Sequence, residues 1–186
     1  MSGRPSFAPD TWDDLRMPLE TVKVGSAAPP DYEVFRGDLK AYAFDDSRDE
    51  FVHFALQMPH RWKFGTSIRP HLHIGFPAAT VNGETVRFEL QYSVQSPMGG
   101  TFASQTQIGA LYTIDTANAY DAQYGHTFLS LPPIDMTGHT ASAMILCRLF
   151  RDVSEDDYAQ DVSVFEFDVH FLSDSLGTVE ELTRKP

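Results

Sequence analysis

Two histidines, His71 and His73, are the residues whose type and spacing are best suited to chemistry. Side chains alternate between the two faces of a β-strand, so this spacing places both imidazoles on one face and Leu72 and Ile74 on the other. Two imidazoles on a rigid strand can hold part of a zinc or ferrous-iron site, or can line a polar contact surface. The function of the chain therefore depends on what the rest of the molecule brings to this face.

Other strands of the sequence carry polar residues at alternate positions in the same way. Residues 164–171 place Glu166, Asp168 and His170 on one face and apolar side chains, Val169 among them, on the other. If these strands belong to one sheet, their histidines and carboxylates converge. The predicted polar-face cluster, a candidate assembly contact, comprises His53, Arg69, His71, His73, Glu89, Gln91, Glu166, Asp168 and His170.

A metal site needs three or four ligands, and His71 and His73 supply two of them. We predict His170 as the third ligand, with Glu89 and Asp168 as alternatives. The competing interpretation is an ordinary solvated face, because polar faces of antiparallel sheets commonly meet water. We expect no cofactor other than a divalent metal at His71 and His73.

The spacing of Gly65, His71 and His73 resembles the opening of the cupin metal motif. In cupins a glutamate follows the second histidine by four or five positions, but Pro77 and Ala78 stand there in this chain. The sequence also lacks a Gly-x-Ser-x-Gly elbow, a glycine-rich phosphate loop and a CxxC pair. A cupin-like metal-dependent enzyme acting on a small molecule is therefore an alternative hypothesis, and a non-enzymatic protein is the main one.

The elements that position these residues are predicted to be strands. Alternating apolar residues mark strands, separated by turn residues that include Asn82-Gly83, over residues 51–58, 86–94, 107–114, 126–131, 141–150 and 163–171. Residues 116–124 are the best candidate for a short helix or turn. Regular strands without long intervening helices predict an all-β, single-domain antiparallel β-sandwich, most plausibly a jelly roll.

Prolines at positions 5, 9, 18, 29 and 30 interrupt the first thirty residues. We therefore predict an extended N-terminal arm over residues 1–31, anchored by Trp12 and Leu15, and a jelly-roll domain over residues 32–186.

Composition limits the partners. The 186 residues carry a net charge of −12, which disfavours a surface for nucleic-acid phosphates or anionic lipid. No apolar run reaches the roughly 18 residues that a membrane-spanning helix needs. We expect neither nucleic acid nor membrane as a direct partner.

Five sequence blocks resemble a widespread family of small virion structural proteins of tailed bacteriophages. The blocks are TWDDLR at 11–16, QMPHRWKFGT at 57–66, PHLH at 70–73, ELQY at 89–92, and EFDVHF at 166–171 followed by DSLG at 174–177. Their order and spacing match across nearly the whole chain. The family's histidine strand usually reads Pro-His-Val-His-Trp, so Leu72 and Ile74 depart from it while keeping the alternation.

The resemblance implies a non-enzymatic structural component that decorates or cements the capsid or forms part of the neck or tail. The implied location is the virion, assembled in the host cytoplasm, with other virion proteins as partners. We expect a homo-oligomer, with a trimer favoured, in which symmetry repeats the polar-face cluster in every copy. A carbohydrate-binding appendage module is a further alternative, based on Tyr120, Tyr124 and Tyr158.

Overall fold

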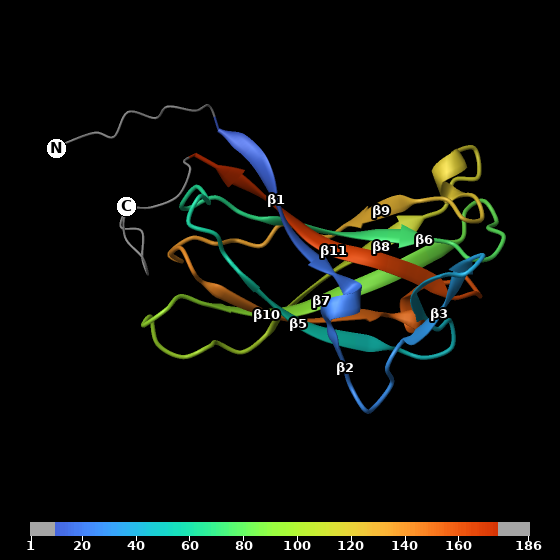
Figure 1. The fold of residues 1–186 in the computed structure, drawn as a ribbon, viewed down its shortest axis with the longest axis horizontal. Coiled ribbons are helices and arrows are strands. Elements are labelled where there is room, and N and C mark those ends of the chain that lie inside the picture. The colour runs from blue at the N-terminus through green and yellow to red at the C-terminus, as the bar shows by residue number, and fades with distance from the viewer. Residues whose placement is uncertain (1–9, 175–186) are drawn as a thin grey trace.

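A computed structural model describes residues 10–174 (Figure 1). The strands are β1 (Thr11–Pro18), β2 (Lys23–Val24), β3 (Asp31–Arg36), β4 (Leu39–Phe44), β5 (Phe51–Gln57), β6 (Arg69–Gly75), β7 (Thr85–Gln95), β8 (Thr106–Thr113), β9 (Thr127–Ser130), β10 (Met144–Arg151) and β11 (Val162–Ser173). Three single 3-10 turns lie between them: η1 (Leu19–Thr21), η2 (Ala119–Asp121) and η3 (Val153–Glu155). In this part of the chain no helix is long and apolar enough to cross a membrane.

The strands form two antiparallel sheets that face each other. The six-stranded sheet has the order β3-β4-β11-β6-β9, with β1 added alongside β11, and the five-stranded sheet has the order β2-β5-β10-β7-β8. Figure 1 shows β11 and β6 in one layer and β5, β7 and β10 in the other. The predicted all-β antiparallel sandwich of jelly-roll character is confirmed.

The alternation in the sequence explains why the sandwich forms. In β7, Val86, Phe88 and Leu90 are fully buried between the sheets, and the Phe88 ring packs edge-on against Phe44 of the opposite layer. Burying side chains of this size stabilises the fold by about 1.5–3 kcal/mol each. The outward positions are then free to carry polar groups.

The predicted N-terminal arm differs from the structure. Residues 11–18 form β1, which pairs with β11 along its whole length, and Lys23–Val24 form β2, which pairs with β5. This segment therefore contributes a strand to each sheet. The pairing with β1 satisfies backbone groups of β11 that would otherwise be exposed along part of its edge. Residues 1–9, the remaining start of the predicted arm, lie outside the described residues.

Only one of the two predicted anchors of the arm packs on the core. Leu15 is partly buried against it. Trp12 points to the other side of β1 and stays 50% exposed, with the guanidinium of Arg69 4.7 Å from its ring centroid. The odd and even positions of β1 thus separate a core side from an outer side.

A β-bulge in β11 changes the predicted face of one residue. The register with β6 shifts between Val164 and Glu166, and Phe165 packs against Phe35 and His126 instead of joining Phe167 in the core. Gly75 gives the Phe165 ring its room, since a Cβ atom there would lie 2.7 Å from that ring. Glu166, Asp168 and His170 keep their common outward face.

Arg151, at the end of β10, is a fully buried cation. It pairs with both carboxylate oxygens of Asp156 at 2.8 and 3.0 Å and donates to the carbonyls of Phe44, Tyr158 and Gln160. Every donor of the guanidinium is directed at an acceptor that replaces water. The group fastens the β10–β11 connection to the end of β4.

Replacing Arg151 with Met should lower the free energy of unfolding by about 3–5 kcal/mol, because the nearly buried Asp156 carboxylate would lose its counter-charge. Urea unfolding followed by circular dichroism measures the change. Arg148→Met is the matched control, since that guanidinium packs at the surface over Phe51 and Phe150 and should cost no more than about 1 kcal/mol. Equal losses in the two variants would contradict this role for Arg151.

Candidate functional site

The candidate site lies on the outer face of the six-stranded sheet and is assembled by strand register. Asp168 of β11 stands directly opposite His71 of β6, and Glu166 stands opposite His73. On the other side of β11, β1 places Arg16 opposite Asp168 and Asp14 opposite His170. The three strands bring residues far apart in the chain onto one surface.

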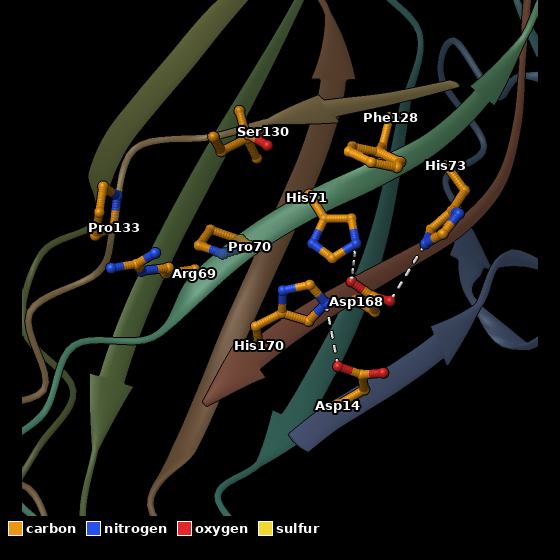
Figure 2. A pocket seen from close by; sticks show the side chains of 11 residues that line it. Asp14, Arg69, Pro70, His71, His73, Phe128, Ser130, Pro133, Asp168 and His170 are labelled. Carbon is orange, nitrogen blue, oxygen red and sulfur yellow. Dashed lines mark hydrogen bonds and ion pairs between the residues drawn. The ribbon is translucent and has the colours of Figure 1, made fainter. Parts of the chain in front are cut away.

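Asp168 lies between two imidazoles. Its Oδ1 is 2.6 Å from Nε2 of His71, and its Oδ2 is 3.3 Å from Nε2 of His73, as Figure 2 shows. Asp168 is 4% and His71 7% exposed, so both are buried although they are on the outer face. We call His71, His73, Asp168 and His170 the His–Asp cluster.

One oxygen of Asp168 has no hydrogen bond. The contact from His71 is short, but its direction does not meet hydrogen-bond geometry, and Oδ1 is the buried side-chain polar atom left unsatisfied among the described residues. Burial raises the pKa of Asp168, but the polar contact and charge of His71, together with the charges of His73 and His170, lower this pKa by more. The net pKa is below the ordinary value, which favours the carboxylate form.

The second nitrogen of His73 has a partner of its own. Nδ1 of His73 is 2.8 Å from Nε2 of His126, which precedes β9. Burial, followed by the charge of His73, lowers the pKa of His126, which favours its neutral form. The pair fixes the orientation of the His73 ring, with Nε2 turned toward Asp168.

The remaining polar groups of this face form pairs of their own. His170 Nε2 is 3.1 Å from Asp14 Oδ1, and Arg16 holds both carboxylate oxygens of Glu166 at 2.6 and 2.7 Å. The rings of His170 and His71 are in contact, with centroids 4.3 Å apart. The outer face is therefore a continuous network of acid–base pairs.

A hollow of about 540 Å³ opens beside the cluster. Its lining comprises Asp14, Arg69, Pro70, His71, His73, Phe128, Ser130, Leu131, Pro133, Asp168 and His170 (Figure 2). Its size falls in the range of small-molecule sites, about 300–1,000 Å³. Phe128, which is 59% exposed, stands at the rim next to His71 and His73.

The predicted polar-face cluster is divided between the two sheets. His53 lies on β5, and Glu89 and Gln91 lie on β7, so all three belong to the five-stranded sheet. Glu89 is paired with Arg87 at 2.6 Å, and Gln91 bonds to Gln107. Alternation predicts which face of a strand is polar, but it does not predict to which sheet the strand belongs.

The grouping of metal donors differs from the predicted set in one residue. Donor atoms of His71, His73 and Asp168 all lie within 4.8 Å of one another, whereas His170 forms a separate group with Asp14 and Asp168. The strand register explains why Asp168 takes the place predicted for His170, because Asp168 is opposite His71 and His170 is opposite Arg69. The sequence interpretation missed Asp14, which was assigned to the arm, and His126, which follows a glycine in a turn.

The tyrosines that motivated the carbohydrate-binding alternative do not form one surface. Tyr158 is 1% exposed and belongs to the core. Tyr124 packs edge-on against Phe35 and beneath Arg36, and Tyr120 is 49% exposed. Of the three, only Tyr120 and Tyr124 are at the surface.

Comparisons with known proteins assign this chain to no family. No family model and no curated protein matches the sequence. A carbohydrate-binding module that recognises mannan is 13% identical over 88% of this chain and 99% of its own, with a TM-score of 0.40. Dimeric latent PorU from Porphyromonas gingivalis is 12% identical over 89% of this chain, with a TM-score of 0.35.

An aminopeptidase from a marine sediment archaeon, Thaumarchaeota archaeon, is 9% identical over 89% of this chain, with a TM-score of 0.34. This chain covers 34% of the length of the aminopeptidase and 13% of the length of PorU. At these scores and identities, the likenesses carry no argument about the fold or the function of this chain.

The lowered pKa of Asp168 predicts a component of acid sensitivity. A depressed carboxylate pKa stabilises the fold above the unfolded-state value of about 4, and this stabilisation is lost as the pH falls through the folded-state pKa. As the pH is lowered below about 4, the free energy of unfolding should therefore decrease less in Asp168→Asn than in the unmodified protein. Urea unfolding at pH 7, 5 and 3 measures this, and identical acid losses in both proteins would contradict it.

Proposed function

We propose that the protein is a non-enzymatic structural subunit of a tailed-phage virion, and that the outer face around the His–Asp cluster is its contact with further copies of itself. The observation that carries the proposal is the mixture of charges on that face. Arg16, Arg69 and the histidines lie among Asp14, Glu166 and Asp168. Such a surface is complementary to a second copy of itself, as a symmetric contact requires.

Net charge makes this face the favourable place for contact. Each chain carries a charge of −12, so two copies repel one another over most orientations. On the outer face of the six-stranded sheet, cationic groups are close to carboxylates, and local attraction can offset that repulsion. The mixed charges also set the register of a contact, since like charges placed opposite one another are penalised.

Exposed aromatic residues flank the same face. Trp12 is 50% exposed at one side of the hollow, and Phe128 is 59% exposed at the other. Aromatic residues and arginine are enriched in protein interfaces, and tryptophan and arginine are frequent among the residues that contribute most binding energy. The hollow between them gives a second copy a concave surface to fill.

Three of the five resemblance blocks coincide with the strands of this face. Residues 11–16 lie in β1, residues 70–73 in β6, and residues 166–171 in β11, and these strands are hydrogen-bonded neighbours. The resemblance to tailed-phage virion proteins therefore includes the three strands that carry the charged residues of this face. In a homo-oligomer, a trimer being favoured, each copy would contribute this face to an assembly that decorates the capsid or forms part of the neck or tail.

The assembly contact predicts a charge-sensitive oligomer. Size-exclusion chromatography with light scattering should find an oligomer of the 20.8 kDa chain, a trimer being expected, and Phe128→Glu should reduce it to a monomer. Leu146→Glu is the matched control, because Leu146 is 45% exposed on the outer face of the five-stranded sheet and should leave the oligomer intact. A monomeric unmodified protein, or equal effects of the two variants, would overturn the proposed contact.

The virion role is tested separately by mass spectrometry of particles purified from a culture that produces this chain. The protein should be present at a fixed ratio to the major capsid protein after density-gradient purification. Its absence from intact particles would reject the role, whatever its oligomeric state in solution.

A further inference from the structure

Three donor groups of the His–Asp cluster converge as a metal site would require. Nε2 of His71 and Nε2 of His73 each face a different carboxylate oxygen of Asp168, and one donor atom from each of the three residues lies within 4.8 Å of the other two. We infer that His71, His73 and Asp168 bind one divalent transition-metal ion, zinc or ferrous iron. The site is contained in one chain, so this inference goes beyond the assembly role and does not depend on it.

The separations between donors fit coordination with a small adjustment. Metal–ligand distances of about 2.0–2.1 Å in a tetrahedral site place neighbouring donors roughly 3.3 Å apart. The His73–Asp168 separation of 3.3 Å meets this value. The His71–Asp168 contact of 2.6 Å, which is made to the other carboxylate oxygen, would have to open by roughly 0.7 Å when a metal binds.

The unsatisfied oxygen of Asp168 is an independent indication of a ligand. This oxygen is buried on a residue that is 4% exposed, and it has no hydrogen bond. Leaving a buried charged acceptor without a partner costs more than about 1–3 kcal/mol, whereas a cation at this position would satisfy it. The oxygen is 2.6 Å from Nε2 of His71, so a cation that satisfied it would also lie next to that nitrogen.

A residue behind the ligands already orients one of them. His126 Nε2 lies 2.8 Å from His73 Nδ1, on the opposite side of the His73 ring from Asp168. In the tautomer in which Nδ1–H of His73 donates a hydrogen bond to Nε2 of His126, the Nε2 lone pair of His73 is free for a metal. Partners of this kind are a regular feature of histidine ligands, and removing one usually weakens metal binding about 10–100-fold.

The donor set and its surroundings indicate which ion would bind. Two imidazoles and one carboxylate suit zinc and ferrous iron, whereas calcium and magnesium prefer sites built from oxygen donors. Three protein ligands leave at least one coordination position open, and the hollow of about 540 Å³ lies beside them. That position would take water or a small anionic or neutral oxygen donor from the hollow.

Titration calorimetry with zinc chloride on chelator-treated protein tests the inference. We expect one ion per chain with micromolar or tighter affinity, and binding of Co²⁺ should produce visible absorption typical of a tetrahedral site. His73→Ala should weaken zinc binding by more than about 100-fold, and His126→Ala by about 10–100-fold. Calcium should show no saturable binding.

Two further variants separate this site from other histidine sites. His53→Ala, on the other sheet, should bind zinc as the unmodified protein does. His170→Ala should also keep its zinc affinity, because His170 is grouped with Asp14 and Asp168 and not with the two histidines. A loss in His170→Ala as large as that in His73→Ala would overturn the assigned ligand set.

The inference fails if zinc shows no saturable one-to-one binding up to about 1 mM, which corresponds to a binding free energy of only about −4 kcal/mol. It also fails if His73→Ala and Asp168→Asn both bind zinc normally. Circular dichroism of each variant without metal verifies folding, and His73→Ala is informative even if Asp168→Asn unfolds, because the His73 side chain is 25% exposed. Stoichiometry per chain is measured whether or not the chain oligomerises, so failure here and failure of the assembly contact are distinguishable.

Discussion

The pairing of β11 with β6 is the constraint on which the rest of the outer face depends. It places a carboxylate on the strand that β1, β4 and β6 all flank, at a position that is 4% exposed. A charge removed from water in this way must be compensated by neighbours, and the imidazoles of His71 and His73 occupy the two sides where compensation is needed. A shift of one residue in this register would turn those side chains toward the core.

The sequence predicted local properties of the chain well. Alternation in residues 86–94 and 163–171 identified strands and, apart from Phe165 at the bulge, their buried faces, since each pattern reflects the two-residue repeat of a single strand. Alternation did not predict how the strands combine into sheets. Glu89 and Asp168 are equally polar and equally outward in sequence, yet they lie on opposite sheets, because sheet membership is fixed by contacts between distant segments.

The dependence on contacts between distant segments also explains why the sequence did not single out the residues that meet at the candidate site. Nothing near Asp168 in the sequence distinguishes it from His170 as a partner of His71; only the β11–β6 register does. The bulge that moves Phe165 out of the core and the pairing of β1 with β11 are also tertiary effects. Prolines in the first thirty residues favoured an extended arm, and an extended segment is also what an edge strand needs, so local signals could not separate the two.

The pairing of β1 with β11 also governs when this surface can exist. One of these strands begins at residue 11 and the other ends at residue 173, so nearly the whole described chain separates two hydrogen-bonded neighbours. Contacts so distant in sequence are slow to form, because the loop they close is long and its entropy must be lost first. During synthesis, Asp14 and His71 emerge from the ribosome well before Asp168. A nascent chain therefore cannot display the completed face before β11 has emerged, and any ion or neighbouring copy that recognises the face is restricted to chains that have folded through β11.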